Sequence, residues 1–168
     1  RLSALLDRHR PDIVVSMGDS FHDRAGATMM PTIYRESVAA MAAQRDWYWI
    51  AGNHDPDAPA GLPGRSVSEI RVAGLTFRHE PSAKQAEGEI AGHLHPGARI
   101  VRRGRSVRRR CSATDGMRLV MPAFGAFTGT LNVLDRAYHG LFGEGRLTAY
   151  VLGEERVYPI AAGMLSAG

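Results

Sequence analysis

The sequence has almost no lysine, a single cysteine and no long apolar run. The lone Cys111 excludes an internal disulfide framework and a zinc cage built from cysteines, and it favours a reducing, cytoplasmic setting. No apolar run approaches the roughly 18–20 residues that cross a bilayer, so we expect no membrane span. Apolar residues still make up 44% of the chain, which is enough for a packed core and excludes a disordered protein.

The length of 168 residues predicts one domain over residues 1–168, at about 150 residues per domain. The chain starts at Arg1 rather than Met, and no charged-then-apolar signal segment precedes the predicted fold. We therefore expect that the native N-terminus lies upstream of Arg1.

The positive charge is concentrated in one segment. Lys84 is the one lysine among 21 basic residues, and seven of the arginines fall within the twelve residues from Arg99 to Arg110. Without these seven charges the formal net charge of +4 becomes −3. The sequence therefore describes a mildly acidic protein with a single basic patch.

The order of predicted elements favours an α/β fold. A helix over 1–10 precedes a short apolar run, Asp12–Met17, that is typical of a buried central strand. A second helix over 29–43 leads to another apolar run, Trp47–Ile50. Strands alternating with helices indicate a parallel sheet. After a Pro- and Gly-rich loop over 57–64, short β-like pieces separated by turns at Gly74, Gly104 and Gly116 predict antiparallel strands later in the chain.

Three predicted strands are each followed by a loop that begins with glycine and carries metal-ligand residue types. These loops are Gly18–Asp23, Gly52–Asp55 and Gly92–Pro96, and Phe77–Glu80 contributes a further histidine between the last two. Ligand sites in α/β folds gather at the carboxyl ends of strands. Carboxylate, amide and imidazole donors together suit Mn, Fe, Zn or Ni. His93 and His95, two residues apart, would share one face of an extended segment.

The ordered set resembles the calcineurin-like metallophosphoesterases, whose pattern runs D-x-H, GD-x-x-[DH], GNH-[DE], H, GH-x-H. Gly18–His22 matches the second block, Gly52–Asp55 the third, His79 the lone histidine and Gly92–His95 the last. The first block is absent, and family order places it before Arg1. The resemblance implies a four-layered α/β/β/α metallophosphoesterase sandwich with mixed sheets, here without its N-terminal strand and first metal motif.

The resemblance also implies a dinuclear metal centre, with Mn first and Fe, Zn or Ni as alternatives. The implied ligands are Asp19, Asn53, His79, His93 and His95. Two divalent cations in such a site activate a water and clamp phosphate oxygens. His54 would protonate the leaving oxygen and Asp55 would orient His54, while His22 is expected near the site without being a ligand.

Two stretches, Asp12–Asp23 and Met121–Val133, resemble the bacterial ligase-associated DNA damage response endonuclease subfamily. That resemblance implies a DNA endonuclease acting in DNA repair, in functional association with an ATP-dependent DNA ligase, a helicase and an exonuclease. One alternative is a small-molecule phosphatase or cyclic-nucleotide phosphodiesterase, because fold and metals do not fix the substrate. The other is a non-catalytic scaffold of the same fold.

Three further features have two interpretations each. The arginine segment either contacts a nucleic-acid backbone or is a solvated face, and the residues concerned are Arg102, Arg103, Arg105, Arg108, Arg109 and Arg110. Phe124 and Phe127 either sit on a loop bordering the site or pack beneath it, and packing is favoured. Neighbouring arginines could lower the pKa of Cys111, but an incidental cysteine is favoured.

Overall fold

The computed structural model describes residues 1–21, 25–57, 59–84 and 86–167. They form two compact units, residues 1–70 and residues 71–168, and each is described by itself. No helix among these residues is long and apolar enough to cross a membrane. The single domain expected over 1–168 stays a prediction.

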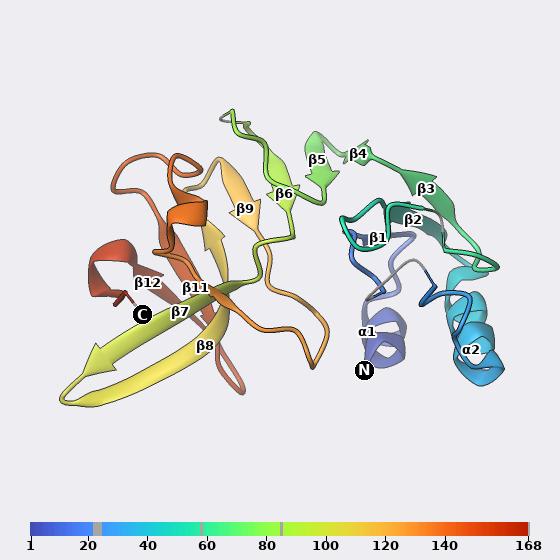
Figure 1. Cartoon of the computed structure of the whole chain (residues 1–168), viewed down its shortest axis with the longest axis horizontal. Coiled ribbons are helices and arrows are strands. Elements are labelled where there is room, and N and C mark those ends of the chain that lie inside the picture. The colour runs from blue at the N-terminus through green and yellow to red at the C-terminus, as the bar shows by residue number, and fades with distance from the viewer. Residues whose placement is uncertain (22–24, 58, 85, 168) are drawn as a thin grey trace. The chain divides into compact units, whose positions relative to one another are not determined.

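The first unit has a three-stranded parallel sheet with two helices against one of its faces (Figure 1). Trp47 and Trp49 are two positions apart in the central strand, so their side chains point to the same face. There the two rings stack with centroids 5.4 Å apart. Leu6 and Ala42, one from each helix, complete this buried cluster. The elements are α1 (Leu2–His9), β1 (Ile13–Ser16), α2 (Thr32–Ala42), β2 (Asp46–Ile50) and β3 (Arg65–Val67).

Two expectations for this unit need correction. β1 lies at one edge of the described sheet, with β2 in the centre, and its residues are only half-buried or exposed. Helix α2 begins three residues later than predicted, and its large apolar residues Ile33 and Tyr34 are 69% and 63% exposed. The helix packs through Val38, Met41 and Ala42 instead.

The second sheet has nine strands in a mixed arrangement, and most of them belong to the second unit. Its central path runs β10-β7-β8-β9-β6-β5-β4, and β11 joins β8 and β12. The strands are β4 (Glu69–Val72), β5 (Leu75–Arg78), β6 (Glu89–Ala91), β7 (Pro96–Arg102), β8 (Arg105–Thr114), β9 (Arg118–Val120), β10 (Leu131–Asn132), β11 (Thr148–Leu152) and β12 (Val157–Ala161). Parallel and antiparallel pairs occur together, as the sequence predicts, and the α/β class is confirmed. β3 and β10 were not predicted.

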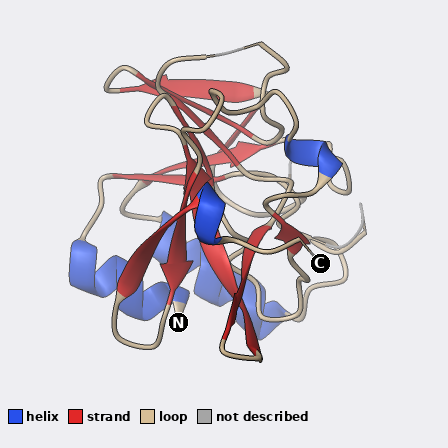
Figure 2. Cartoon of the chain, turned by 90° about the vertical axis from the view of Figure 1, so that its left-hand side faces the viewer, coloured by secondary structure: helices blue, strands red, loops and turns tan. Residues whose placement is uncertain are grey.

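The core of the second unit is made of small and medium side chains from β7, β8, β9 and β11. Ala98, Cys111, Ala113, Val120 and Ala149 are all fully buried. Tyr138, from the short 3-10 helix Arg136–Tyr138, is also buried in this core, and a second 3-10 helix spans Ala162–Met164. Figure 2 shows how little of the chain is helical compared with its strands.

A buried ion pair secures the segment between β5 and β6. Arg118 Nε lies 2.7 Å from Glu89 Oε1, and both side chains are almost completely buried. The Arg118 guanidinium also donates to the carbonyl oxygens of Ser82, Lys84 and Leu141. One buried cation of β9 therefore ties the segment between β5 and β6 to the neighbouring strand.

Candidate functional site

In the first unit, two of the predicted loops lie at the carboxyl ends of the strands. β1 and β2 are parallel neighbours, so their carboxyl ends meet, and Asp19 and Asp55 follow them. The backbone N–H groups of Asp19, Ser20 and Phe21 donate to the Asp55 carboxylate at 2.8, 2.7 and 3.2 Å. The His54 N–H donates to Asp19 Oδ1 at 2.9 Å. The two loops are thus joined through both aspartates.

The expected role of Asp55 changes with this geometry. Its carboxylate is buried and bonds three backbone amides, and among the described residues it makes no hydrogen bond to the His54 ring. Asp55 therefore orders the loop that carries Asp19. His54 and Asn53 are exposed at the same edge. His22, predicted near the site, lies outside the described residues.

Position 52 requires glycine because atoms of the two loops lie too close to its α-carbon to leave room for a side chain. A Cβ at this position would collide with the backbone nitrogen and side chain of Asp19 and with the Asp55 carboxylate. Asp19 itself has a left-handed φ of 48°, which is uncommon for a residue with a side chain. The loops are held in a conformation that a relaxed turn would not adopt.

The second unit brings two of the predicted histidines into contact. β5 and β6 are parallel neighbours, and His79 and His93 follow their carboxyl ends. His93 Nδ1 lies 3.2 Å from His79 Nε2, with the rings edge to face. His79 is buried and His93 is half-buried. Two imidazole nitrogens this close are suited to bind one transition-metal cation.

The Gly92–His95 segment is bent rather than extended, which corrects the period-two expectation. His93 and His95 both have left-handed backbones, with φ of 61° and 45°. Among the described residues, six that are not glycine have positive φ, and Asp19, His93 and His95 are three of them. Backbone strain at predicted ligands is typical of a functional site.

The arginine segment forms the β7–β8 hairpin, whose turn residues Arg103 and Gly104 both have positive φ as a two-residue hairpin turn requires. Arg99, Arg108 and Arg110 project from one face and bond backbone carbonyls of the second unit. The remaining four are exposed and make no hydrogen bond or ion pair among the described residues: Arg102, Arg103, Arg105 and Arg109. The predicted patch thus divides into arginines that hold the fold and arginines that face solvent.

Phe124 and Phe127 do not pack beneath the site, contrary to the favoured interpretation. They are 49% and 96% exposed. Burial raises the pKa of the Cys111 thiol to about 12, so the nearby arginines do not activate it and Cys111 is a core residue.

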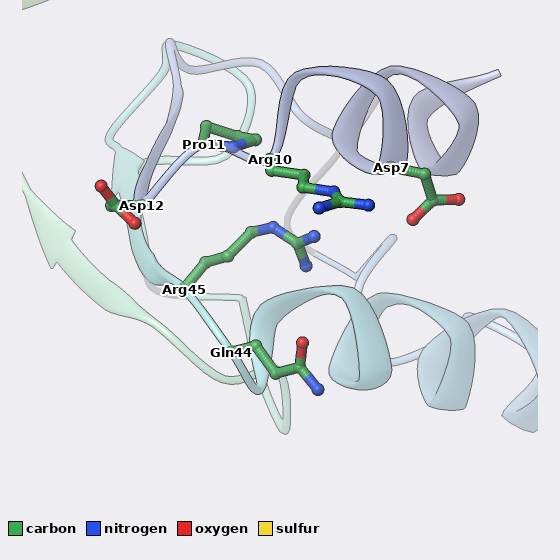
Figure 3. A pocket seen from close by; sticks show the side chains of 6 residues that line it. All are labelled: Asp7, Arg10, Pro11, Asp12, Gln44 and Arg45. Atoms are coloured by element: carbon green, nitrogen blue, oxygen red, sulfur yellow. The ribbon is translucent and has the colours of Figure 1, made fainter.

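A hollow of about 350 Å³ in the first unit is not part of this site. Its lining comes from the end of α1, the residues after α2 and the residues just before β1 (Figure 3). The Asp46 N–H donates to the Asp12 carbonyl where β1 and β2 begin, so the hollow is at the opposite end of the strands from Asp19. No histidine lines it: Asp7, Arg10, Pro11, Asp12, Gln44 and Arg45 do.

Comparison with known proteins agrees with these motifs. The family model for calcineurin-like phosphoesterases matches residues 1–113. Among solved structures, a nuclease MPE from Pseudomonas putida is similar, with a TM-score of 0.74 and 27% sequence identity over 95% of this chain and 76% of that one. No curated protein sequence matches the chain. Since the matched region contains the ordered Asp, Asn and His loops, the chain belongs to the calcineurin-like phosphoesterases, which are metal-dependent hydrolases of phosphoester bonds.

Proposed function

We propose that this protein is a divalent metal-dependent DNA nuclease that uses Mn²⁺ and acts in DNA repair. The observation that carries the proposal is the His79–His93 pair, with ring nitrogens 3.2 Å apart at the carboxyl ends of parallel strands. Family membership supplies the phosphoester chemistry, and similarity to a nuclease favours a nucleic-acid substrate. Association with a DNA ligase, a helicase and an exonuclease belongs to the proposal and rests on the subfamily resemblance.

The proposed metal ligands are Asp19, Asn53, His79, His93 and His95. Their oxygen and nitrogen donors fit a transition metal of intermediate hardness. These residues would hold divalent cations, which would supply an activated water and neutralise charge on the phosphate.

The remaining groups of the chain then have separate tasks. In this proposal His54 donates a proton to the leaving oxygen; its exposure and the bond of its backbone N–H to Asp19 support that role. Asp55 keeps the Asp19 loop in position through three amide hydrogen bonds. Arg102, Arg103, Arg105 and Arg109 are exposed on the hairpin and offer guanidinium groups to backbone phosphates.

The test compares two substrates with one Mn²⁺-loaded preparation of the full-length protein. Bis-p-nitrophenyl phosphate reports phosphodiester chemistry, and supercoiled plasmid reports DNA cleavage. We expect both to be cleaved, Asp19→Ala to lose both activities, and the exposed control Asp57→Ala to keep them. Cleavage of the small ester alone would overturn the nuclease proposal in favour of a small-molecule phosphodiesterase.

His54 needs its own variant. His54→Ala should lower kcat by about 10²- to 10⁴-fold, the usual contribution of a positioned acid, while the bound metal content stays that of the wild type. Unchanged kcat would exclude His54 as the proton donor. Full-length protein that turns over neither substrate with Mn, Fe, Ni or Zn would favour the scaffold alternative.

A further inference from the structure

The loop over residues 121–130 begins at the carboxyl end of β9, next to the strand ends that carry the histidines. β9 is the parallel neighbour of β6, and β6 is the parallel neighbour of β5. The carboxyl ends of these three strands therefore meet. His79 follows the first of them, the Gly92–His95 bend follows the second, and the 121–130 loop follows the third. Figure 1 shows this loop running out from β9 in light orange.

Both ends of the loop are tied to the histidine bend. The Met121 N–H donates to the Ala91 carbonyl at 2.8 Å, and the Leu131 N–H donates to the His95 carbonyl at 3.0 Å. Thr130 packs where any side chain at Gly97 would stand. The loop is thus fixed on either side of the bend that holds His93 and His95.

Arg110 holds the middle of the loop. One guanidinium nitrogen donates to the Ala123 carbonyl at 3.0 Å, and another donates to those of Thr128 and Ala126 at 2.8 and 3.3 Å. Arg108 donates to the Thr130 carbonyl at 3.1 Å. Because four loop carbonyls are bonded to side chains of β8, the loop has a defined conformation although it contains no helix or strand.

This ordered loop presents an aromatic ring to solvent. Phe127 is 96% exposed, and its neighbours in the sequence are Ala126 and Thr128. Residues 121–130 contain no charged side chain, and Phe124 and Met121 on the same loop are 49% and 39% exposed, so the loop offers apolar groups with Phe127 the most exposed of them. Three exposed apolar side chains within ten residues are still a smaller surface than the roughly 20–30 residues a side of a standard protein interface.

We propose that the 121–130 loop is a stacking element for an unpaired nucleobase of the substrate, with the Phe127 ring as its platform and Arg110 as the residue that positions it. This inference rests on the proposed function. Aromatic side chains stack on single-stranded bases whatever their identity. A base within a duplex is already stacked on both faces, so the ring selects unpaired DNA.

The test measures binding by fluorescence anisotropy with a labelled single-stranded oligonucleotide and its matched duplex. The full-length protein is used in the Asp19→Ala background, which prevents cleavage. Phe127→Ala should weaken single-strand binding about 5- to 100-fold, the usual effect of losing one stacked base, and the dependence of affinity on salt should not change. Phe127→Trp should restore the affinity. Tyr34→Ala, which removes an exposed aromatic residue from α2, is the matched control and should bind as the background does.

A double-mutant cycle tests the role of Arg110. Arg110→Met should reproduce the loss seen with Phe127→Ala, add little to it in the double variant and leave the salt dependence in place. If the slope of log affinity against log salt concentration instead falls by the amount of about one phosphate contact, Arg110 binds the DNA backbone. That result would overturn the positioning role.

Two results would overturn the stacking inference itself. The first is equal single-strand affinity for Phe127→Ala and its background. The second is a concentration-dependent dimer of the parent protein that Phe127→Ala abolishes, since the ring would then be an interface between copies. Cleavage by the wild-type protein distinguishes these results from failure of the proposed function. If only the stacking inference is wrong, the wild type still cleaves both the plasmid and the small ester.

Discussion

The Asp55 carboxylate accepts a hydrogen bond from the backbone N–H of Asp19 at 2.8 Å. This bond joins the ends of two parallel strands and fixes the residue that the family pattern identifies as a metal ligand. We expect Asp55→Ala to lower the free energy of unfolding by about 1–3 kcal/mol, because three amides lose a charged acceptor. Urea denaturation would measure the loss. Asp57→Ala, an exposed change two residues away, should unfold with the wild-type midpoint, and equal midpoints for all three proteins would contradict the role of Asp55.

Gly52→Ala should disturb the same two loops without changing any charge. The added methyl group would meet the Asp19 backbone, the Asp19 side chain and the Asp55 carboxylate, so one loop must move. We expect phosphodiesterase activity to fall at least about tenfold, because a displacement of about 1 Å can cost 100-fold in rate. Gly163→Ala has open space at its Cβ and is the control for the substitution itself. Full activity in Gly52→Ala would show that the loops tolerate the shift.

Glu89→Gln should be among the most destabilising single changes in the second unit. It leaves the buried guanidinium of Arg118 without its carboxylate, and breaking a buried pair in this way costs about 3–5 kcal/mol. Thermal unfolding followed by circular dichroism would measure it. Glu87→Gln, an exposed change just before β6, should leave the melting temperature within about 1–2 °C, since surface changes are small. A melting temperature for Glu89→Gln equal to that of the control would contradict the prediction.

Asp115 should make stability depend on acidic pH. Burial opposes its ionisation, but the backbone N–H groups of Gly143, Met117 and Arg118 donate to the carboxylate, and the net effect lowers its pKa below the usual value. A lowered folded-state pKa stabilises the protein fully above the unfolded-state pKa of about 3.9, and this stabilisation is lost as pH falls through the folded-state pKa.

The corresponding variant is Asp115→Asn. At pH 7 it should unfold more easily by about 1–3 kcal/mol, and the difference from the wild type should shrink as the pH is lowered below about 4. Unfolding curves at several pH values measure both effects. A difference that stays constant down to the lowest pH at which the protein folds would show that the charge of Asp115 is not what stabilises the loop.

The arrangement of most strands follows from local patterns. Alternating helices and apolar runs predicted the parallel sheet of the first unit, and glycines at 74, 104 and 116 marked turns that all have positive φ. The sequence could not show that β1 lies at an edge, because a strand's neighbours are set by pairing partners far along the chain. β10 was missed because a strand of two residues, Leu131–Asn132, is too short to produce a pattern.

The sequence by itself determined the family and the chemistry, because glycine-led loops with Asp, Asn and His in a fixed order survive as a linear pattern. Only the tertiary structure decided what the other polar and aromatic residues do. Seven similar arginines divide into three that bond backbone carbonyls and four that face solvent, because Arg103 lies in the hairpin turn and the side chains of the paired strands alternate between two faces. Phe127 is exposed on a loop whose backbone is bonded by Arg110, a residue of β8 that precedes it in the sequence by 17 positions. Exposure and partnership depend on which distant segments meet, and no short stretch of sequence records that.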